Sequence, residues 1–261
     1  MEVHHHPIAI GSHTSRNKWT HYFWEFLMLF LAVFCGFLAE NQREHYIEKI
    51  RAKQYARSLI SDLKKDTAMI NAIIRQLKNS ITRADSLAVL LTNKPVDQIR
   101  NIDLFTLSTE LYRHYTWSRA TLEQIKNSGS LRYFSNDSII ARISSYDAFT
   151  RHMDEDYKGD EARAHRAVEK RNQIVDHNYP RQFIISLLAN RDSLMKTDYF
   201  NEMAKNGPRL LTSNINDVKI FLNEKLSIRQ HFSTRGESEL PELIKDAEEL
   251  ILLLKKEFHL K

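Results

Sequence analysis

Residues 40–91 contain no glycine and no proline, and their apolar side chains recur in alternating steps of four and three. This spacing places them on one face of a helix, and its persistence over five heptads is typical of coiled coils and helical bundles. Leu59, Ile73 and Leu87 widen the apolar stripe, which favours a bundle over a bare two-stranded coil. The predicted seam comprises Ala56, Ile60, Leu63, Thr67, Ile70, Ile74, Leu77, Ile81, Ala84, Ala88 and Leu91. We therefore predict one long heptad-patterned helix within a multi-helix bundle, ending at residues 92–95.

Residues 22–39 form an apolar stretch in which Glu25 is the only charged side chain. As a helix, the stretch would span about 27 Å, close to the ~30 Å of a bilayer's hydrocarbon core. Trp19, Tyr22 and Trp24 gather at its N-terminal end, where amphipathic rings sit at the level of lipid headgroups. This aromatic belt argues against a buried core helix. We predict a retained transmembrane helix.

Two other interpretations of this stretch fit less well. A cleaved signal peptide ends at a small-residue cleavage site, whereas this stretch continues directly into a predicted helix. A lipoprotein site at Cys35 needs a small residue before the cysteine, but the bulky Phe34 stands there. We therefore divide the chain into a polar tail (1–19), a transmembrane helix (20–40) and a helical bundle domain (41–261).

The lysines and arginines are placed unevenly around the predicted transmembrane helix. Two precede it, at positions 16 and 18, and five follow it within eighteen residues. Cytoplasmic flanks of membrane helices carry an excess of Lys and Arg. We expect a single-pass protein whose bundle domain faces the cytoplasm.

One face of the predicted transmembrane helix is lined by small residues. At 100° per residue this face comprises Glu25, Leu29, Ala32, Gly36 and Ala39, and five phenylalanines lie nearly opposite. Ala32 and Gly36 are four residues apart, and small residues at this spacing let two helices approach closely in lipid. Glu25 is costly inside a membrane and is therefore a functional candidate, unless it reaches back to the headgroups. We predict that the helix self-associates through this face.

The remainder of the chain is predicted to form further helices joined by short loops. Asn136 is expected to cap a helix that Gly159 interrupts, and Gly129 is expected to adopt a left-handed conformation after an earlier helix. Loops are expected at residues 206–208 and 233–236. The predicted helices cover residues 103–125, 136–157, 162–175, 181–195, 216–231 and 241–258. The fold class predicted for the whole chain is all-α.

Composition agrees with this fold class and narrows the possible partners. Six glycines and five prolines in 261 residues are too few for a protein rich in turns. The 38 basic and 33 acidic side chains are interspersed, so we expect no nucleic-acid binding. With Cys35 as the only cysteine, no intramolecular disulfide and no zinc site of paired cysteines can form.

Common catalytic signatures are absent from the sequence. It contains no glycine-rich phosphate loop, no dinucleotide-binding fingerprint, no nucleophile elbow and no His-Glu-x-x-His zinc motif. Active sites also favour loops, which are few here. We expect neither enzymatic activity nor a cofactor.

Two groups of side chains share helix faces that could bind a metal ion. His152 and Asp156 form one group, and Glu161, His165 and Glu169 form the other, each at a spacing of four residues. Bundles with two metal ions use a Glu-x-x-His spacing of three instead. Interleaved Arg and Lys residues favour surface ion pairs here, so we predict no metal site.

Four polar and aromatic residues, Tyr112, His114, Tyr115 and Trp117, lie close together in the sequence. On a helix they would point in several directions, and only Tyr115 would join the apolar stripe. Core packing is the expected role, and a ligand pocket lined by aromatic rings is the alternative.

Several segments resemble a bacterial family of single-pass membrane-anchored helical proteins that open with Met-Glu-Val-His-His-His. These segments are residues 1–7, 22–33, 39–45, 59–67, 122–129 and 254–260. The resemblance covers most of the chain. It implies that the histidine run is native and that the protein belongs in a bacterial inner membrane, but it implies no activity.

Together these features favour a non-enzymatic helical module that is tethered to the bilayer and assembles with itself or with a membrane protein partner. A metal-binding or ligand-sensing helical bundle is the alternative.

Overall fold

A computed structural model describes residues 16–108 and 114–261, and these residues form an all-α structure without β-strands. The elements are α1 (Arg16–Asn93), η1 (Val96–Gln98), α2 (Asn101–Ser108), α3 (Ala120–Asn127), η2 (Ser130–Tyr133), α4 (Asp137–Asn172), α5 (Arg181–Leu194), α6 (Asp198–Asn206), α7 (Ile215–Thr234), the π-helical turn η3 (Arg235–Glu239) and α8 (Leu240–Phe258). The chain divides into two compact units, Met1–Gln54 and Tyr55–Lys261, and α1 contributes to both. The predicted fold class is confirmed.

Within the first unit, α1 carries the apolar stretch on an exposed surface. The helix is long and apolar enough to cross a membrane, and no residue of its most apolar window is buried. Leu29 and Phe37 each expose 68% of their surface. A contiguous exposed apolar surface of this kind is typical of membrane or protein contacts.

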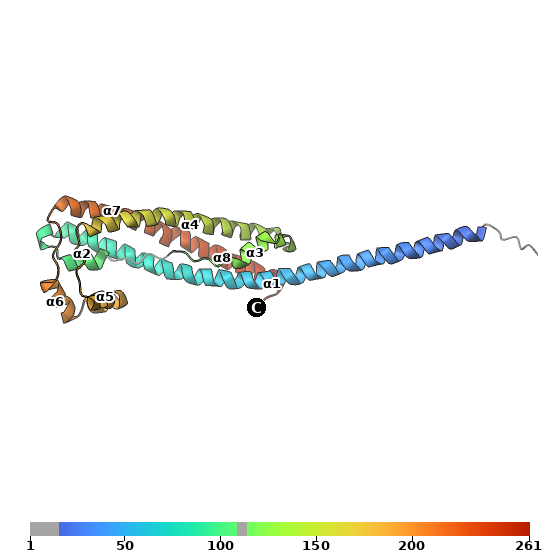
Figure 1. Ribbon diagram of the computed structural model, residues 1–261, viewed down its shortest axis with the longest axis horizontal. Coiled ribbons are helices and arrows are strands. Elements are labelled where there is room, and N and C mark those ends of the chain that lie inside the picture. Colours follow the sequence, from blue (N-terminus) through green and yellow to red (C-terminus); the bar gives the residue numbers. More distant parts are fainter. Residues whose placement is uncertain (1–15, 109–113) are drawn as a thin grey trace, which may run out of the picture. The chain divides into compact units, whose positions relative to one another are not determined.

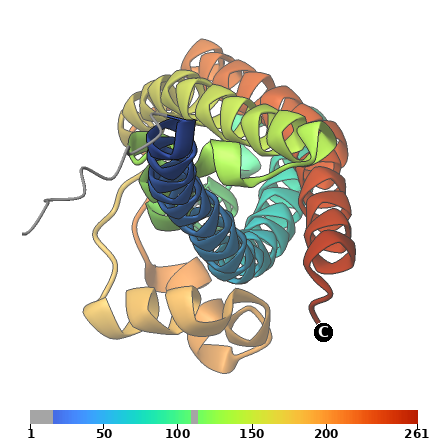
Figure 2. The ribbon, with the colours of Figure 1, turned by 90° about the vertical axis from the view of Figure 1, so that its right-hand side faces the viewer.

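In the second unit, the part of α1 after residue 55 packs with α4, α7 and α8 around a shared core (Figures 1 and 2). Leu63 and Ile70 of α1 are fully buried there, together with Ile139 and Met153 of α4. Helix α8 contributes residues three or four positions apart, as an amphipathic helix should. They are Leu240, Leu243, Ala247, Leu250 and Leu254.

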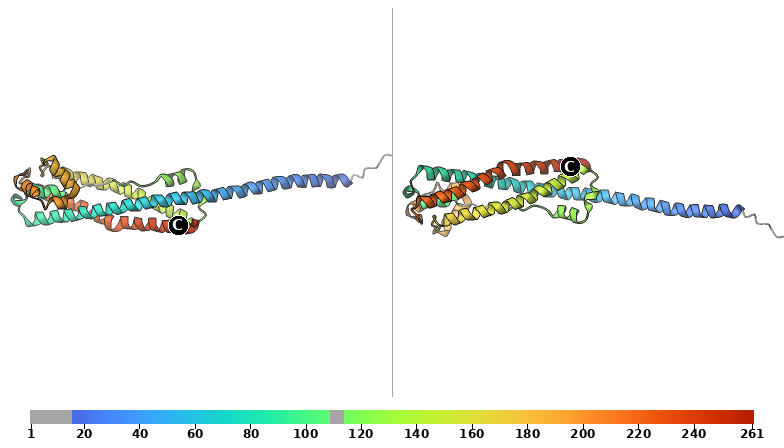
Figure 3. Two further views of the ribbon diagram at one scale, coloured as in Figure 1. Left: turned by 90° about the horizontal axis from the view of Figure 1, so that it is seen from below. Right: turned by 90° about the horizontal axis from the view of Figure 1, so that it is seen from above.

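A second core lies at the end of the bundle where α1 ends, and α5 and α6 gather there (Figure 3). Phe183 of α5 is completely buried at its centre. Its ring stacks on Tyr179 with centroids 4.9 Å apart and lies 6.4 Å from Phe200 of α6. The aromatic rings fix α5 and α6 against α2 and the end of α1.

The buried face of α1 combines half of the predicted seam with the row of residues that was predicted to widen it. Half of that seam, the heptad from Ala56 to Ala84, is buried as predicted, whereas Thr67 and Ile74 of the other half are only half-buried. The buried partner row contains the predicted Leu59, Ile73 and Leu87, together with Asp66 and Ser80. Asp66 and Ser80 are polar, so a pattern of apolar residues alone does not predict that they lie in the core.

The prediction of a single helix over residues 103–125 is wrong. Two helices, α2 and α3, occupy this stretch, and residues 114–119 between them are not helical. The Ser118 amide donates a hydrogen bond to the Asp66 carboxylate at 2.8 Å instead of joining a helical ladder. Residues 109–113 of the predicted helix lie outside the described residues. Long-range partners outweigh local helical periodicity here.

Gly159 does not interrupt α4, which is continuous. Single glycines are tolerated inside helices at a modest cost. A Cβ atom at this position would lie 3.1 Å from the Arg163 guanidinium, so the glycine leaves room for that side chain to reach Asp160.

The predicted loop at residues 233–236 is also wrong. Helix α7 passes through η3 into α8 without leaving helical geometry. Gly236 is buried there, and a Cβ atom at this position would lie 3.5 Å from the Leu77 side chain. The glycine therefore marks close packing against α1 rather than a turn.

Other local signals are confirmed. The Asn136 side chain caps α4 by accepting a hydrogen bond from the Ser138 amide at 3.0 Å. Gly129 adopts φ 66°, in the left-handed region, and residues 207–208 lie outside the helices. The sequence prediction missed α6, which Thr197 caps through the Phe200 amide.

Candidate functional site

Four buried aspartates, Asp62, Asp66, Asp147 and Asp160, distinguish the bundle core of the second unit. A buried carboxylate is costly unless cations or hydrogen-bond donors compensate its charge. The contacts of these carboxylates therefore show which elements of the bundle they connect.

Asp66 connects three parts of the bundle. From α1, its carboxylate accepts hydrogen bonds from the Ser118 amide at 2.8 Å and from the Tyr146 hydroxyl of α4 at 3.1 Å. Burial raises the pKa of Asp66, although both hydrogen bonds oppose that rise. One turn earlier, Asp62 accepts a hydrogen bond from the Thr121 hydroxyl of α3 at 2.6 Å. Together the two aspartates fasten the start of α3 to α1.

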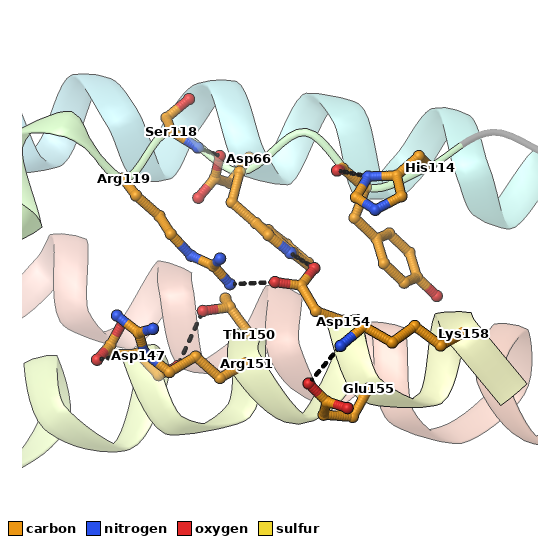
Figure 4. A network of polar contacts seen from close by, with 12 residues as sticks. Asp66, His114, Ser118, Arg119, Asp147, Thr150, Arg151, Asp154, Glu155 and Lys158 are labelled. Carbon is orange, nitrogen blue, oxygen red and sulfur yellow. Dashed lines mark hydrogen bonds and ion pairs between the residues drawn. The ribbon is translucent and has the colours of Figure 1, made fainter.

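Residues 114–119 form the linker before α3, and Asp154 of α4 holds this linker from its other side (Figure 4). The Trp117 indole donates a hydrogen bond to this carboxylate at 2.8 Å, and the Arg119 guanidinium pairs with it at 2.8 Å. Residues 117–119 are thus clamped between carboxylates of two helices.

Asp147 of α4 is held by two cations. Lys126 of α3 donates to its carboxylate at 2.7 Å, and Arg151 donates at 3.2 Å while also pairing with Glu123. Burial alone would raise the pKa of Asp147, but these two hydrogen bonds outweigh it and hold the pKa below its usual value. This cluster joins α3 to α4.

Arg235 of η3 is the centre of the second charged cluster. Its guanidinium contacts Asp160 at 3.2 Å, Asp156 at 2.8 Å and the Glu239 carboxylate one turn ahead. Burial lowers the pKa of Arg235, but its three carboxylate partners raise it further, so the side chain remains a cation. Asp160 also lies 3.5 Å from Arg163. The cluster fixes the turn between α7 and α8 against α4.

These contacts form a clamp on two connecting segments of the bundle. The charged groups pair across elements, and the pairs hold the 114–119 linker and the π-helical turn in place. Buried pairs of this kind are weak stabilisers but strong determinants of which arrangement a bundle adopts.

Sequence reasoning missed Asp62, Asp66 and Arg235 as structural centres. The available signal was position: Asp66 stands where a heptad core residue is due, and a polar residue there needs a specific partner. Its partners are 52 and 80 positions away, so they could not be read from local spacing.

The two candidate metal groups remain separate in the structure. His152 lies 3.2 Å from Asp156, which also pairs with Arg235. Glu161, His165 and Glu169 are exposed along α4. Among residues 16–108 and 114–261, no three His, Cys, Asp or Glu side chains are grouped so that they could hold a metal ion.

The aromatic cluster forms on a non-helical segment instead of a helix. Tyr115 is buried and stacks on Trp117 with centroids 5.2 Å apart, and His114 meets the Tyr157 ring edge-on at 4.5 Å. Tyr112 lies outside the described residues. The rings that the structure describes pack against the core, which is the expected role.

The predicted association face is exposed along its whole length in the first unit. Glu25, Leu29, Ala32, Gly36 and Ala39 are all exposed, and a Cβ atom at Gly36 would meet no heavy atom within 4 Å outside its own helix backbone. Glu25 contacts the His21 imidazole at 3.0 Å, one turn toward the N-terminus. Glu25 is therefore directed toward the end of the apolar stretch.

Comparison of the chain with protein-family models, with curated proteins and with solved structures gave no match. The structure itself defines an all-α protein with one exposed apolar helical stretch and a bundle clamped by buried ion pairs.

Proposed function

We propose that this protein is a non-enzymatic, single-pass membrane module that tethers a rigid helical bundle to the bacterial inner membrane. One observation supports the proposal above others: the most apolar window of α1 has no buried residue and only one charged side chain, Glu25. The lipid bilayer is the partner whose chemistry fits this surface. The excess of Lys and Arg after the stretch supports a cytoplasmic bundle.

The association face supports a second partner, another copy of the same helix. Ala32 and Gly36 provide a shallow surface on which a second backbone can approach closely. Phe26, Phe30 and Phe34 stack along a different side, with centroids 6.3 and 5.8 Å apart, and suit contact with lipid. A membrane protein with a similar small-residue face is the alternative partner. Nucleic acid is not expected.

Membrane insertion and orientation are tested first. We expect the full chain to sediment with bacterial membranes after alkaline carbonate washing, because an apolar helix of this length leaves lipid only in detergent. Release by carbonate would contradict the tether. Protease added to spheroplasts should spare the bundle, and cleavage from the periplasmic side would overturn the cytoplasmic orientation.

Self-association is tested with two matched substitutions. Gly36→Ile adds bulk to the association face, whereas Phe34→Ile changes the phenylalanine side. Because open space surrounds Gly36 in the single chain, any effect of Gly36→Ile reports on a contact between chains. We expect Gly36→Ile to weaken dimerisation at least about tenfold in a membrane two-hybrid assay, with Phe34→Ile unchanged. If the two variants dimerise equally well, self-association does not use this face.

A further inference from the structure

Residues 40–54 continue α1 beyond the apolar stretch and remain within the first unit, and we call this segment the stalk. Most of its side chains are polar, but two large side chains with apolar surface are exposed among them. Tyr46 exposes 67% of its surface and Ile50 exposes 42%. Single exposed apolar residues are ordinary, so their position on the helix decides whether they indicate a contact.

Tyr46 and Ile50 lie where the association face continues into the stalk. Tyr46 follows Ala39 by seven residues, and Ile50 follows Gly36 by fourteen. At 100° per residue, both lie within about 60° of Glu25 around the helix. Positions 43, 46, 50 and 54 are all exposed and extend this face to the end of the first unit. One face of α1 is therefore open from the membrane stretch through the stalk.

The extension gives this face the length of a coiled-coil seam. Between Glu25 and Ala39 the spacing of four and three residues covers two heptads, and up to Ile50 it covers more than three. Spacing sustained over about three to four heptads is typical of coiled coils. Within lipid, apolar contacts between helices gain little, because the lipid tails are equally apolar. Burial of Tyr46 and Ile50 removes apolar surface from water and is favourable.

Arg43 is the charged residue that the seam crosses near the start of the stalk, and its charge is balanced within its own helix. The Glu40 carboxylate accepts one hydrogen bond from the Arg43 Nε atom at 3.0 Å and another from its Nη2 atom. Two such pairs side by side carry no net charge. A polar residue at one core position of a coiled coil fixes the register of the helices at some cost in stability. Lys53, three residues after Ile50, ends the seam.

We infer that the stalk forms a parallel two-stranded coiled coil with the stalk of a second copy of this chain. The inference rests on the proposed membrane tether, because insertion in one direction makes the two helices parallel. Between residues 40 and 50, one side of the seam carries Glu40, Glu44 and Glu48, and the other side carries Lys49. The twofold symmetry of a parallel pair sets the acidic side of each helix against the basic side of the other.

Disulfide cross-linking of the full chain in isolated bacterial membranes tests the coiled coil. Cys35→Ala removes the native cysteine, and single cysteines are then placed on the seam (Tyr46→Cys or Ile50→Cys) or opposite it (Asn41→Cys or His45→Cys). A disulfide needs Cα atoms within ~7 Å, so we expect at least about tenfold more linked dimer from the seam positions after oxidation. Equal linking at all four positions, or none at the seam, would overturn the coiled coil. A linked product with the mass of a different protein would overturn the choice of partner.

Ala39→Cys, in the same background, separates this inference from the proposed association within the membrane. Linking at Ala39 without linking at Tyr46 and Ile50 keeps the membrane contact and overturns the coiled coil. Linking at both stalk positions without linking at Ala39 supports the coiled coil and overturns the membrane contact.

A charge placed on the seam provides an independent test. In the chain with Tyr46→Cys, we expect Ile50→Lys to reduce linking about tenfold, because it replaces an apolar contact with two facing cations. Asn41→Lys adds the same charge on the opposite side and should leave linking unchanged. Both variants should keep the Tm of the bundle, since both positions lie outside the second unit. Unchanged linking in Ile50→Lys would overturn the seam.

Discussion

At the scale of single residues, two substitutions of Asp66 distinguish the cost of burying its charge from the contribution of the hydrogen bonds that its carboxylate accepts. Asp66→Asn keeps an acceptor oxygen for the Ser118 amide and removes the buried charge. Asp66→Ala leaves the Ser118 amide and the Tyr146 hydroxyl without their partner. We expect Asp66→Ala to lower the free energy of unfolding by about 1–3 kcal/mol and Asp66→Asn to lower it by less, measured by urea denaturation.

The pH dependence provides a sharper test of the same residue. Because the pKa of Asp66 is raised in the folded protein, the folded state retains this proton to higher pH than the unfolded state does. The contribution of Asp66 to stability therefore falls as pH rises from its ordinary pKa of 3.8 through the raised value. Asp66→Asn should lose this dependence, whereas the exposed control Asp97→Asn should retain it. Identical pH profiles for Asp66→Asn and wild type would contradict a raised pKa.

Residue-scale prediction from sequence succeeded where the signal was local. The cap at Asn136 and the left-handed Gly129 depend on neighbours within a few positions, and both were predicted. The polar core positions Asp66 and Ser80 were not, because their roles depend on groups from other helices. Asp66 meets the linker before α3, and Ser80 faces a cleft that α2 and α5 complete.

At the scale of elements, the π-helical turn η3 sets the rotation of α8. A π turn adds one residue to a helix, so deleting Gly236 should restore α-helical pairing and rotate α8 by about 100°. Such a rotation would carry Leu243 and Leu250 away from the core. We expect the deletion to abolish the cooperative thermal transition of the bundle, followed by circular dichroism.

Gly236→Ala is the matched control for that deletion. Its added methyl group would meet the Leu77 side chain at 3.5 Å, an ordinary packing distance. Alanine also costs less than glycine inside a helix, so we expect stability to be unchanged or raised by up to about 1 kcal/mol. A normal transition in the deletion variant would show that η3 does not determine how α8 packs.

Element boundaries show why part of the fold resisted prediction. Heptad spacing predicted α1 correctly because its period persists over many turns. The Gly and Ser residues at 233–236 resembled a loop, but the ion pairs of Arg235 and the packing of Gly236 against Leu77 keep this stretch helical. The opposite error occurred at residues 114–119. Apolar spacing favoured a helix there, but the segment is not helical, and carboxylates of α1 and α4 bind it through hydrogen bonds.

At the scale of the whole molecule, the described residues of the two core clusters lie between Ala56 and Leu254. Removing residues 1–40 should therefore leave a water-soluble protein whose Tm stays within a few degrees of the full chain in detergent. Size-exclusion chromatography and circular dichroism measure both properties. Aggregation, or the loss of a cooperative transition, would mean that the bundle depends on its apolar segment.

The core of the bundle is completed late in synthesis, because α1 is made before α8, which completes its burial. At about 5–20 residues per second, the ribosome needs roughly 10–30 s to pass from Leu87 to Leu254. Until the end of that interval the apolar face of α1 lacks α8, although α4 and α7 are made earlier. A nascent chain held at the membrane beside others would expose this face to its neighbours. We expect chaperone protection, or exchange of α8 between chains synthesised together, to follow from a bundle whose core α8 completes.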